Sequence, residues 1–237
     1  MLKSIKNAGL EARLSHEVYT DYSIEIASLE AKWKESLEMF DFPGMEILGG
    51  INTRFIPSPI NQDDYPNLIY DYRNCRYLKK GEALPAGFKT MAGGGNIPCI
   101  IKCILEYFGR NVPLEQIGRL LVQHGYRTPD DGTLWSSFER LLEPIYGIKV
   151  TVPSSLYELI GPILLGQPVI AMIDAEHVYK QYQKYFSREI HGRMAIIIWQ
   201  FTGGHALISC THLYGLHSIK LEDLFPNLYR AWVCKKK

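Results

Sequence analysis

The sequence predicts an α+β protein in which helices come first and an antiparallel sheet follows. Three observations predict this class. Residues 1–40 and 98–165 repeat apolar side chains mainly at helical spacing, residues 169–219 contain short apolar runs typical of strands, and glycine or proline separates these segments. Helical segments followed by a series of strands are typical of α+β folds.

Residues 1–40 are expected to form a helix with one apolar face. The apolar positions recur at steps of three and four residues, and Asp41-Phe42-Pro43-Gly44 ends the pattern. The members of this stripe are Tyr22, Ile26, Leu29, Trp33, Leu37 and Phe40. Such a stripe is typical of a packing face, and a homodimer formed through this helix is one further expectation. Residues 44–95 are expected to be loops whose clustered tyrosines cover a core.

The other elements are expected in order along the chain. Helices are predicted over residues 98–108, 112–123, 134–146 and 155–165, and Gly109 and Gly147 provide two of the stops. Strands are predicted over residues 149–152, 169–174, 194–200, 206–210, 213–219 and 228–234. The apolar run over residues 169–174 predicts a strand buried on both faces. A tight turn over residues 211–214 predicts a hairpin.

Composition excludes several classes of protein. The 26 Lys and Arg residues nearly balance the 25 Asp and Glu residues, so no overall charge recruits nucleic acid. The longest apolar runs fall short of the ~20 residues that a membrane helix needs, and no targeting segment is recognisable. The five cysteines are spread over the chain, which favours a reducing compartment. A cytoplasmic protein without a nucleic-acid partner, a membrane partner, a cofactor or a metal is therefore expected.

Two short segments are candidates for chemistry. Gly203-Gly204-His205 presents a histidine at the start of an apolar strand, and histidine is the usual general base near neutral pH. Gly93-Gly94-Gly95 precedes a helix, whose N-terminus favours an anion or lowers the pKa of a thiol. Cys99 lies one turn into that helix. A hydrogen-bonded core histidine and a flexible glycine loop are the structural alternatives.

A series of motifs over residues 95–220 occurs in a recognisable order. After the helix that Gly109 closes come Val112-Pro113-Leu114-Glu115-Gln116, Arg127-Thr128-Pro129-Asp130-Asp131-Gly132-Thr133, Tyr146-Gly147-Ile148-Lys149-Val150, Gly166-Gln167-Pro168-Val169-Ile170 and Gly204-His205. The series resembles the papain-like core of the bacteriocin-processing (double-glycine leader) cysteine peptidases. The resemblance implies a peptidase-type core over residues 93–237, with residues 1–92 as an N-terminal extension that packs on it.

The resemblance also implies that the nucleophile is replaced. Counting back from Gly109 places Asn96 where the family has its cysteine, and Pro98 matches the proline two residues later. Asparagine is a poor nucleophile and cannot form a thiolate–imidazolium pair. His205 corresponds to the catalytic histidine of the family.

The resemblance leaves the other catalytic positions open. The group that orients the histidine falls at His217 or Ser218, with Asp223 a few residues beyond. Gln62 is the candidate for the glutamine that helps to form the oxyanion hole.

Two functions are consistent with these observations. The first is a pseudoenzyme that binds an extended peptide or a small acyl substrate in the former active-site cleft. Its binding residues are expected to be Asn96, Gly95, Gly204 and Gln62. The second is an active, diverged thiol peptidase, acyltransferase or cyclase in peptide or natural-product processing, which pairs Cys99 with His205. An unrelated α+β protein is a third alternative.

Overall fold

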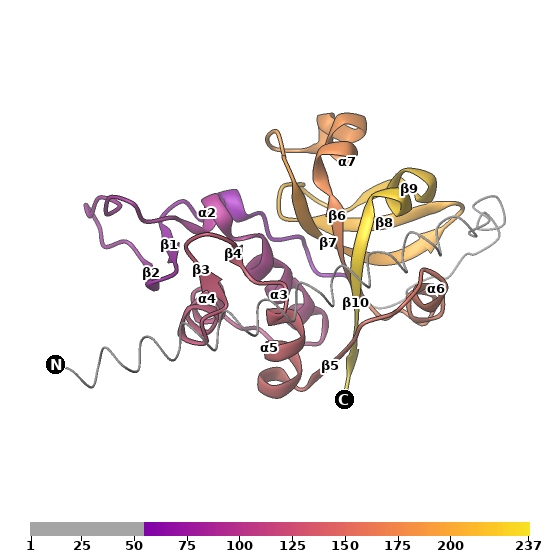
Figure 1. The fold of residues 1–237 in the computed structure, drawn as a ribbon, viewed down its shortest axis with the longest axis horizontal. Coiled ribbons are helices and arrows are strands. Elements are labelled where there is room, and N and C mark those ends of the chain that lie inside the picture. The colour runs from indigo at the N-terminus through magenta and orange to yellow at the C-terminus, as the bar shows by residue number, and fades with distance from the viewer. Residues whose placement is uncertain (1–54) are drawn as a thin grey trace.

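A six-stranded antiparallel sheet forms the centre of the computed structural model, which describes residues 55–237 (Figure 1). The α+β class is therefore confirmed. The expected helix over residues 1–40, with its Trp33 stripe and the dimer contact assigned to it, lies outside the described residues. Among the described residues, no helix is long and apolar enough to cross a membrane.

The sheet has the strand order β5-β10-β6-β7-β8-β9. Its strands are β5 (Ile148–Thr151), β6 (Val169–Asp174), β7 (Arg193–Thr202), β8 (His205–Cys210), β9 (His217–Lys220) and β10 (Leu228–Lys236). Two small hairpins lie outside it, β1 (Leu68–Asp71) with β2 (Asn74–Tyr77), and β3 (Arg127–Thr128) with β4 (Gly132–Thr133). All strand pairs in the three sheets are antiparallel.

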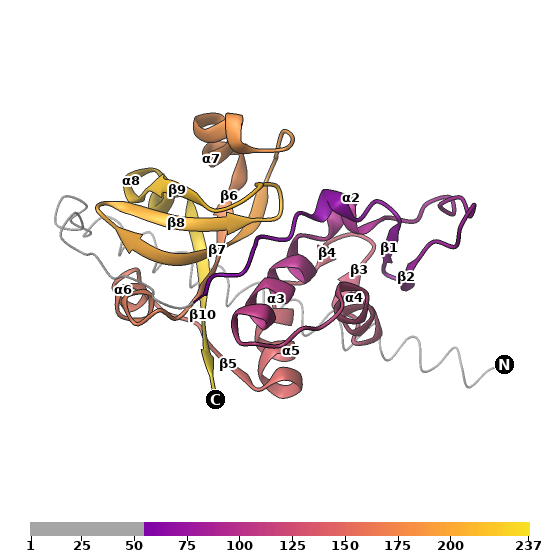
Figure 2. The same ribbon diagram turned by 180° about the vertical axis from the view of Figure 1, so that it is seen from behind.

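Helices cover both faces of the sheet. They are α2 (Met91–Gly94), α3 (Asn96–Tyr107), α4 (Leu114–Gln123), α5 (Ser137–Tyr146), α6 (Tyr157–Leu164), α7 (Ala175–Tyr182) and α8 (Leu221–Leu224). Figures 1 and 2 show α3, α4 and α5 together on one side of the molecule, with the β1–β2 hairpin beyond them. We call this part the helical lobe, and the sheet with α6, α7 and α8 the sheet lobe.

The strand β6 shows why the sheet is buried on both faces. Ile170 and Met172 belong to the core shared with α3, α4 and α5, whereas Val169, Ala171 and Ile173 belong to the core under α6, α7 and α8. Successive side chains of a strand point to opposite faces, so a strand between two helical layers must be apolar throughout. The predicted burial on both faces is confirmed.

Most of the predicted elements occur within a few residues of their expected bounds. Gly109 and Gly147 end α3 and α5 with positive φ values of 78° and 62°, a conformation that glycine adopts without strain. The strand predicted over residues 213–219 is wrong in its extent. Thr211 to Leu216 form a loop, and β9 covers only His217–Lys220.

The sequence did not predict the β1–β2 hairpin within residues 55–92. Leu68, Tyr70 and Cys75 from this hairpin are buried in the same core as α3, α4 and α5. The hairpin turn contains no glycine. Instead, the Asp71 carboxylate accepts hydrogen bonds from the backbone N–H of Arg73 at 3.2 Å and from its Nε at 2.7 Å, which is a turn stabilised by an aspartate side chain.

Candidate functional site

The side chain of Asn96 fastens the first residue of α3 to the sheet. Its Oδ1 accepts a hydrogen bond from the backbone N–H of Ala195 at 2.8 Å, and its Nδ2 donates to the carbonyl of the same residue at 3.1 Å. Nδ2 also donates to Oγ1 of Thr211 at 2.9 Å. Asn96 therefore links α3 in the helical lobe to β7 and to the end of β8.

An amide suits this position because it reproduces the polar groups of a peptide bond. The ladder between β7 and β8 begins with the pair Ile196 and Cys210, so β8 no longer pairs with β7 at Ala195. Ala195 is fully buried, and its backbone N–H and C=O would be costly to leave without partners. Asn96 supplies one strong acceptor and one strong donor, whereas an ionised aspartate only accepts and a cysteine thiol does both weakly.

Gln62 belongs to the same network. Its Oε1 accepts from Thr211 Oγ1 at 3.0 Å, its Nε2 donates to the Ala92 carbonyl at 2.8 Å, and its backbone N–H donates to the Thr211 carbonyl at 3.1 Å. The structure thus brings together Gln62 and Asn96, two of the residues predicted for the site. Thr211, which joins them, was missed by sequence reasoning because no motif marks it.

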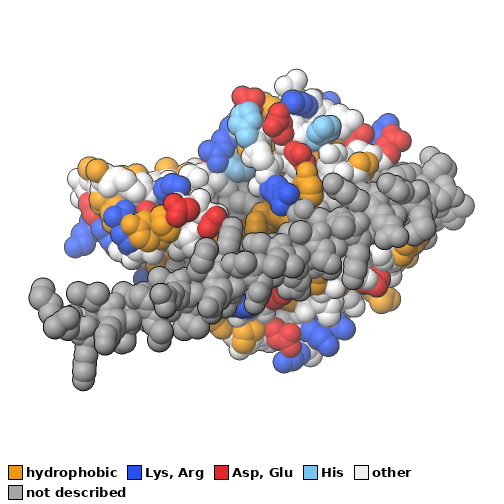
Figure 3. All heavy atoms as spheres, in the orientation of Figure 1, with side chains coloured by type: hydrophobic (Ala, Val, Ile, Leu, Met, Phe, Trp, Pro, Cys, Tyr) orange, Lys and Arg blue, Asp and Glu red, His pale blue; other side chains and the backbone are white. Residues whose placement is uncertain are grey.

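A cavity of about 520 Å³ opens beside this network, between the α2–α3 junction, the β3–β4 turn and the segment that leads into β7. Its lining includes four cationic side chains, Lys89, Arg127, Arg188 and Arg193, and three acidic ones, Asp130, Asp131 and Glu189. Apolar contact surface comes from Ile97, Trp135, Ile190 and Met194. We call this cavity the cleft. Figure 3 shows a notch between the two lobes, with Lys, Arg and His side chains on the side of the sheet lobe.

His212 is the histidine nearest to this network in sequence, one residue after Thr211, and it lines the cleft. Its ring lies 3.6 Å from the Asp63 carboxylate and 3.5 Å from a guanidinium nitrogen of Arg188. Burial lowers the pKa of His212 to about 4, and the neighbouring Arg188 adds to this effect while Asp63 opposes it. His212 is therefore neutral at physiological pH.

His205 and Gly204 lie at the other end of the sheet. His205 pairs with Thr202 at the β7–β8 turn, whereas Asn96 contacts Ala195 at the start of β7. These two ends of β7 are about 23 Å apart at roughly 3.3 Å per residue. The expected approach of His205 to Asn96 or to Cys99 is therefore not formed, because paired catalytic groups need hydrogen-bond distance.

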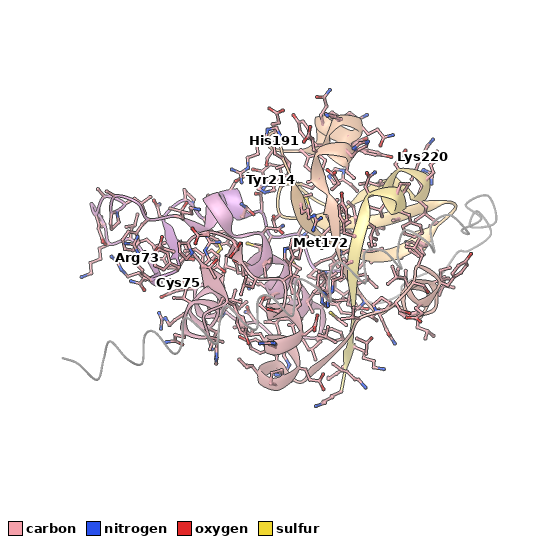
Figure 4. The ribbon with its side chains drawn as sticks, viewed as in Figure 1. Arg73, Cys75, Met172, His191, Tyr214 and Lys220 are labelled. Carbon is pink, nitrogen blue, oxygen red and sulfur yellow. The ribbon has the colours of Figure 1, made fainter. Side chains whose placement is uncertain are left out.

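Figure 4 marks the two sides of the sheet lobe. His191, which lines the cleft, precedes β7, whereas Lys220 lies on the opposite side of the lobe as the Cα partner of His205. His205 Nδ1 is 2.8 Å from the Gly203 carbonyl. His205 is therefore bonded to its own turn and is only half-buried, so it is neither the catalytic base nor the core histidine that the sequence analysis considered.

The expected orienting group for His205 is also not formed. His217 packs against the ring of Tyr185 with centroids 4.7 Å apart, and Ser218 pairs with Leu207 in the β8–β9 ladder. The Asp223 carboxylate accepts hydrogen bonds from Gln181 at 2.8 Å and from Tyr182 at 2.7 Å. None of the three acts on His205.

Gly95 is a packing residue rather than a contact for a ligand. It is buried at the junction of α2 and α3, where a Cβ atom would lie 2.3 Å from Met91 Sδ and 2.5 Å from the Met91 carbonyl. Gly93 and Gly94 line the cleft instead. The three glycines therefore have two roles. Gly95 allows the close turn between α2 and α3, and Gly93 and Gly94 form a part of the cleft wall that has no side chains.

Cys99 is buried and faces the core of the helical lobe. It has no exposed surface, and burial raises the pKa of its thiol well above the usual value, with a further contribution from Cys103. Burial likewise raises the pKa of Cys75, Cys103 and Cys210 to about 12. All five cysteines are buried and free.

We therefore expect slow reaction of every cysteine with iodoacetamide at neutral pH. A raised pKa lowers the thiolate fraction, and only the thiolate is nucleophilic. Mass spectrometry of the folded protein should show each cysteine labelled roughly tenfold or more slowly than free glutathione. The variant His205→Ala should leave the rate at Cys99 unchanged. Fast labelling of Cys99 that this substitution abolishes would contradict the assignment and restore Cys99 as a nucleophile.

No protein-family model, no curated protein and no solved structure matches this chain. Within residues 55–237, no group of three or more His, Cys, Asp and Glu side chains is arranged to hold a metal ion.

Proposed function

We propose that this protein is a non-catalytic member of the papain-like cysteine-peptidase class that binds an extended peptide or a small acyl substrate in the cleft. The observation that carries the proposal is the use of Asn96. Its side chain occupies the position that the resemblance assigns to the nucleophile, and the hydrogen bonds of its amide are made to the sheet.

The arrangement around Asn96 supports this class. A helix N-terminus lies against the start of a central strand in an antiparallel sheet, and a glutamine from an upstream segment lies within the same network. The resemblance assigns these places to the nucleophile and to the oxyanion-hole glutamine, whereas its third position, His205, lies at the other end of β7 and takes no part in the network. Here both side chains hold the lobes together.

The lining of the cleft supports a role in peptide binding. Both lobes contribute polar and charged groups as well as apolar side chains to its lining, a mixture that suits an extended polar ligand. Cys99 is buried and does not line the cleft, and His205 lies at the far end of β7, so no observation favours the diverged enzyme.

Affinity selection tests the proposal. A random decapeptide mixture is passed over the immobilised full chain, and the bound and unbound peptides are identified by mass spectrometry. We expect a reproducible subset of peptides to be enriched and every peptide to be recovered uncleaved.

Two glycine variants supply the matched comparison. Gly93→Trp places a ring in the cleft, where a Cβ atom makes only an ordinary contact of 3.8 Å with Thr90. Gly161→Trp adds the same ring on α6, where a Cβ atom meets nothing within 4 Å. Enrichment should fall roughly tenfold or more in Gly93→Trp and persist in Gly161→Trp. Cleaved peptides, no enrichment, or equal enrichment by both variants would overturn the proposal.

A further inference from the structure

A buried arginine forms part of the cleft wall. Arg127 in β3 is only 6% exposed, and its guanidinium lies over the ring of Tyr70, 4.5 Å from the ring centre. Its Nη1 is 3.4 Å from the Gly94 carbonyl and 3.3 Å from Thr133 Oγ1, both long contacts to neutral oxygens. Within the described part of the chain, its Nε has no hydrogen-bond partner.

The charge of Arg127 is not balanced by a carboxylate. Among the ion pairs of the described residues none involves Arg127. Asp71 is close enough to influence it, but that carboxylate is bonded to Arg73 at 2.7 Å. Burial lowers the pKa of Arg127, yet a guanidinium stays protonated in proteins. A buried cation of this kind is a costly arrangement that an anionic ligand would relieve.

The backbone around the guanidinium leaves room for it. A Cβ atom at Gly94 would lie 2.8 Å from Nη2 of Arg127, and a Cβ atom at Gly132 would lie 3.2 Å from Nη1. Two glycines on separate segments therefore let the guanidinium lie against the backbone at the cleft. The surrounding backbone therefore holds one planar guanidinium at the cleft, and a planar guanidinium is geometrically complementary to a planar carboxylate.

The surrounding charges favour a carboxylate over a phosphate. Asp130 and Asp131 are exposed in the β3–β4 turn and line the same cleft, as does the exposed Glu189. Their solvated charges oppose a dianion more strongly than a monoanion, whereas the buried Arg127 gains most from a ligand that displaces water.

We propose that Arg127 binds a carboxylate of the ligand in the cleft, an inference that rests on the proposed peptide-binding function. The carboxylate is either the C-terminal group of a peptide or the side chain of Asp or Glu. Because the guanidinium is held by Tyr70 and flanked by glycine backbone, it forms a preorganised partner for that single group.

The test compares two decapeptide mixtures on the wild-type chain, one with free C-terminal carboxylates and one with C-terminal amides. Enrichment confined to the free-acid mixture identifies the C-terminal group as the ligand. Enrichment in both mixtures of peptides that contain Asp or Glu identifies an acidic side chain. Enrichment of amidated peptides without Asp or Glu, to the same degree, would overturn the inference, and this comparison needs no variant.

Two substitutions add a second measurement. Arg127→Met keeps the apolar stem against Tyr70 and removes the charge, so we expect a melting temperature no lower than that of the wild type and a loss of carboxylate-peptide enrichment of about tenfold or more. Arg127→Lys should lose part of this enrichment, because lysine keeps the positive charge but lacks the planar guanidinium that can bond to both oxygens of a carboxylate. Sodium acetate should compete with the bound peptides more effectively than sodium phosphate at equal ionic strength.

The outcomes separate the two proposals. If Gly93→Trp abolishes enrichment but Arg127→Met keeps it unchanged, the cleft binds peptides and the Arg127 inference is wrong. If the wild-type chain enriches nothing, the proposed function fails first and the inference fails with it.

Discussion

Replacing Asn96 with alanine is expected to lower the free energy of unfolding by about 2 kcal/mol. The substitution removes three hydrogen bonds and leaves the buried N–H and C=O of Ala195 without their partners. Each buried backbone group left unsatisfied costs about 1–3 kcal/mol, and water from the adjoining cleft relieves part of that cost. Urea unfolding followed by circular dichroism measures the change as a lower midpoint with an unchanged slope.

Two further variants serve as controls for this prediction. Asn111→Ala removes the same side chain from an exposed position in the loop between α3 and α4, and it should change stability by less than about 0.5 kcal/mol. Asn96→Asp keeps the acceptor for Ala195 but loses both donated bonds, so it should be at least as destabilising as alanine. An Asn96→Ala variant as stable as the wild type would show that the amide does not hold α3 to the sheet.

Replacing Glu139 with alanine is expected to cost more, about 3 kcal/mol. Glu139 lies on α5, and its Oε1 accepts from Arg230 Nη2 at 3.0 Å and from Trp232 Nε1 at 2.7 Å, both in β10. Arg230 is 1% exposed. Removing the carboxylate that faces a buried guanidinium typically costs about 3–5 kcal/mol, and the partial exposure of Glu139 favours the lower value.

Glu143→Ala is the matched control for that experiment. Glu143 lies one turn further along α5 and pairs with Lys237, which is 63% exposed, at 3.1 Å. An exposed pair contributes about 0–1 kcal/mol. Equal losses for the Glu139 and Glu143 variants in urea unfolding would mean that the bonds to β10 add nothing beyond a surface ion pair.

The helices and central strands could be predicted because their signals are local. The α3 and α5 helices end at glycines that adopt left-handed conformations, and β6 is apolar at nearly every position because both of its faces are covered. These patterns are visible within ten or so residues. The β1–β2 hairpin was missed because its turn depends on the side chain of Asp71 rather than on glycine.

The candidate site could be predicted only in part. Asn96 and Gln62 were found from the register of the motifs, and the structure brings both to Thr211. His205 was assigned to the site because of its Gly-Gly-His motif. The same two glycines are typical of a hairpin turn, which places His205 away from the site. Gly203 and Gly204 have φ values of 54° and 74° in a two-residue hairpin turn, and such a turn must put His205 at the end of the ladder farthest from the start of β7.

Long-range pairing explains the rest of the difference. Arg127, His212 and Asn96 come from segments far apart in the chain, and only the strand order and the packing of α3 on β7 bring them to one cleft. Residue spacing within one segment cannot predict that these three segments come together. Nor does the sequence around Arg127 indicate that its side chain is buried.

The Asn96 network also fixes one part of the cleft wall. Asn96 lines the cleft and bonds to Ala195 in β7 and to Thr211, so the start of α3 cannot move away from the sheet without breaking three hydrogen bonds. Any opening of the cleft that keeps these bonds has to displace other parts of its lining, such as the β3–β4 turn or residues 188–191.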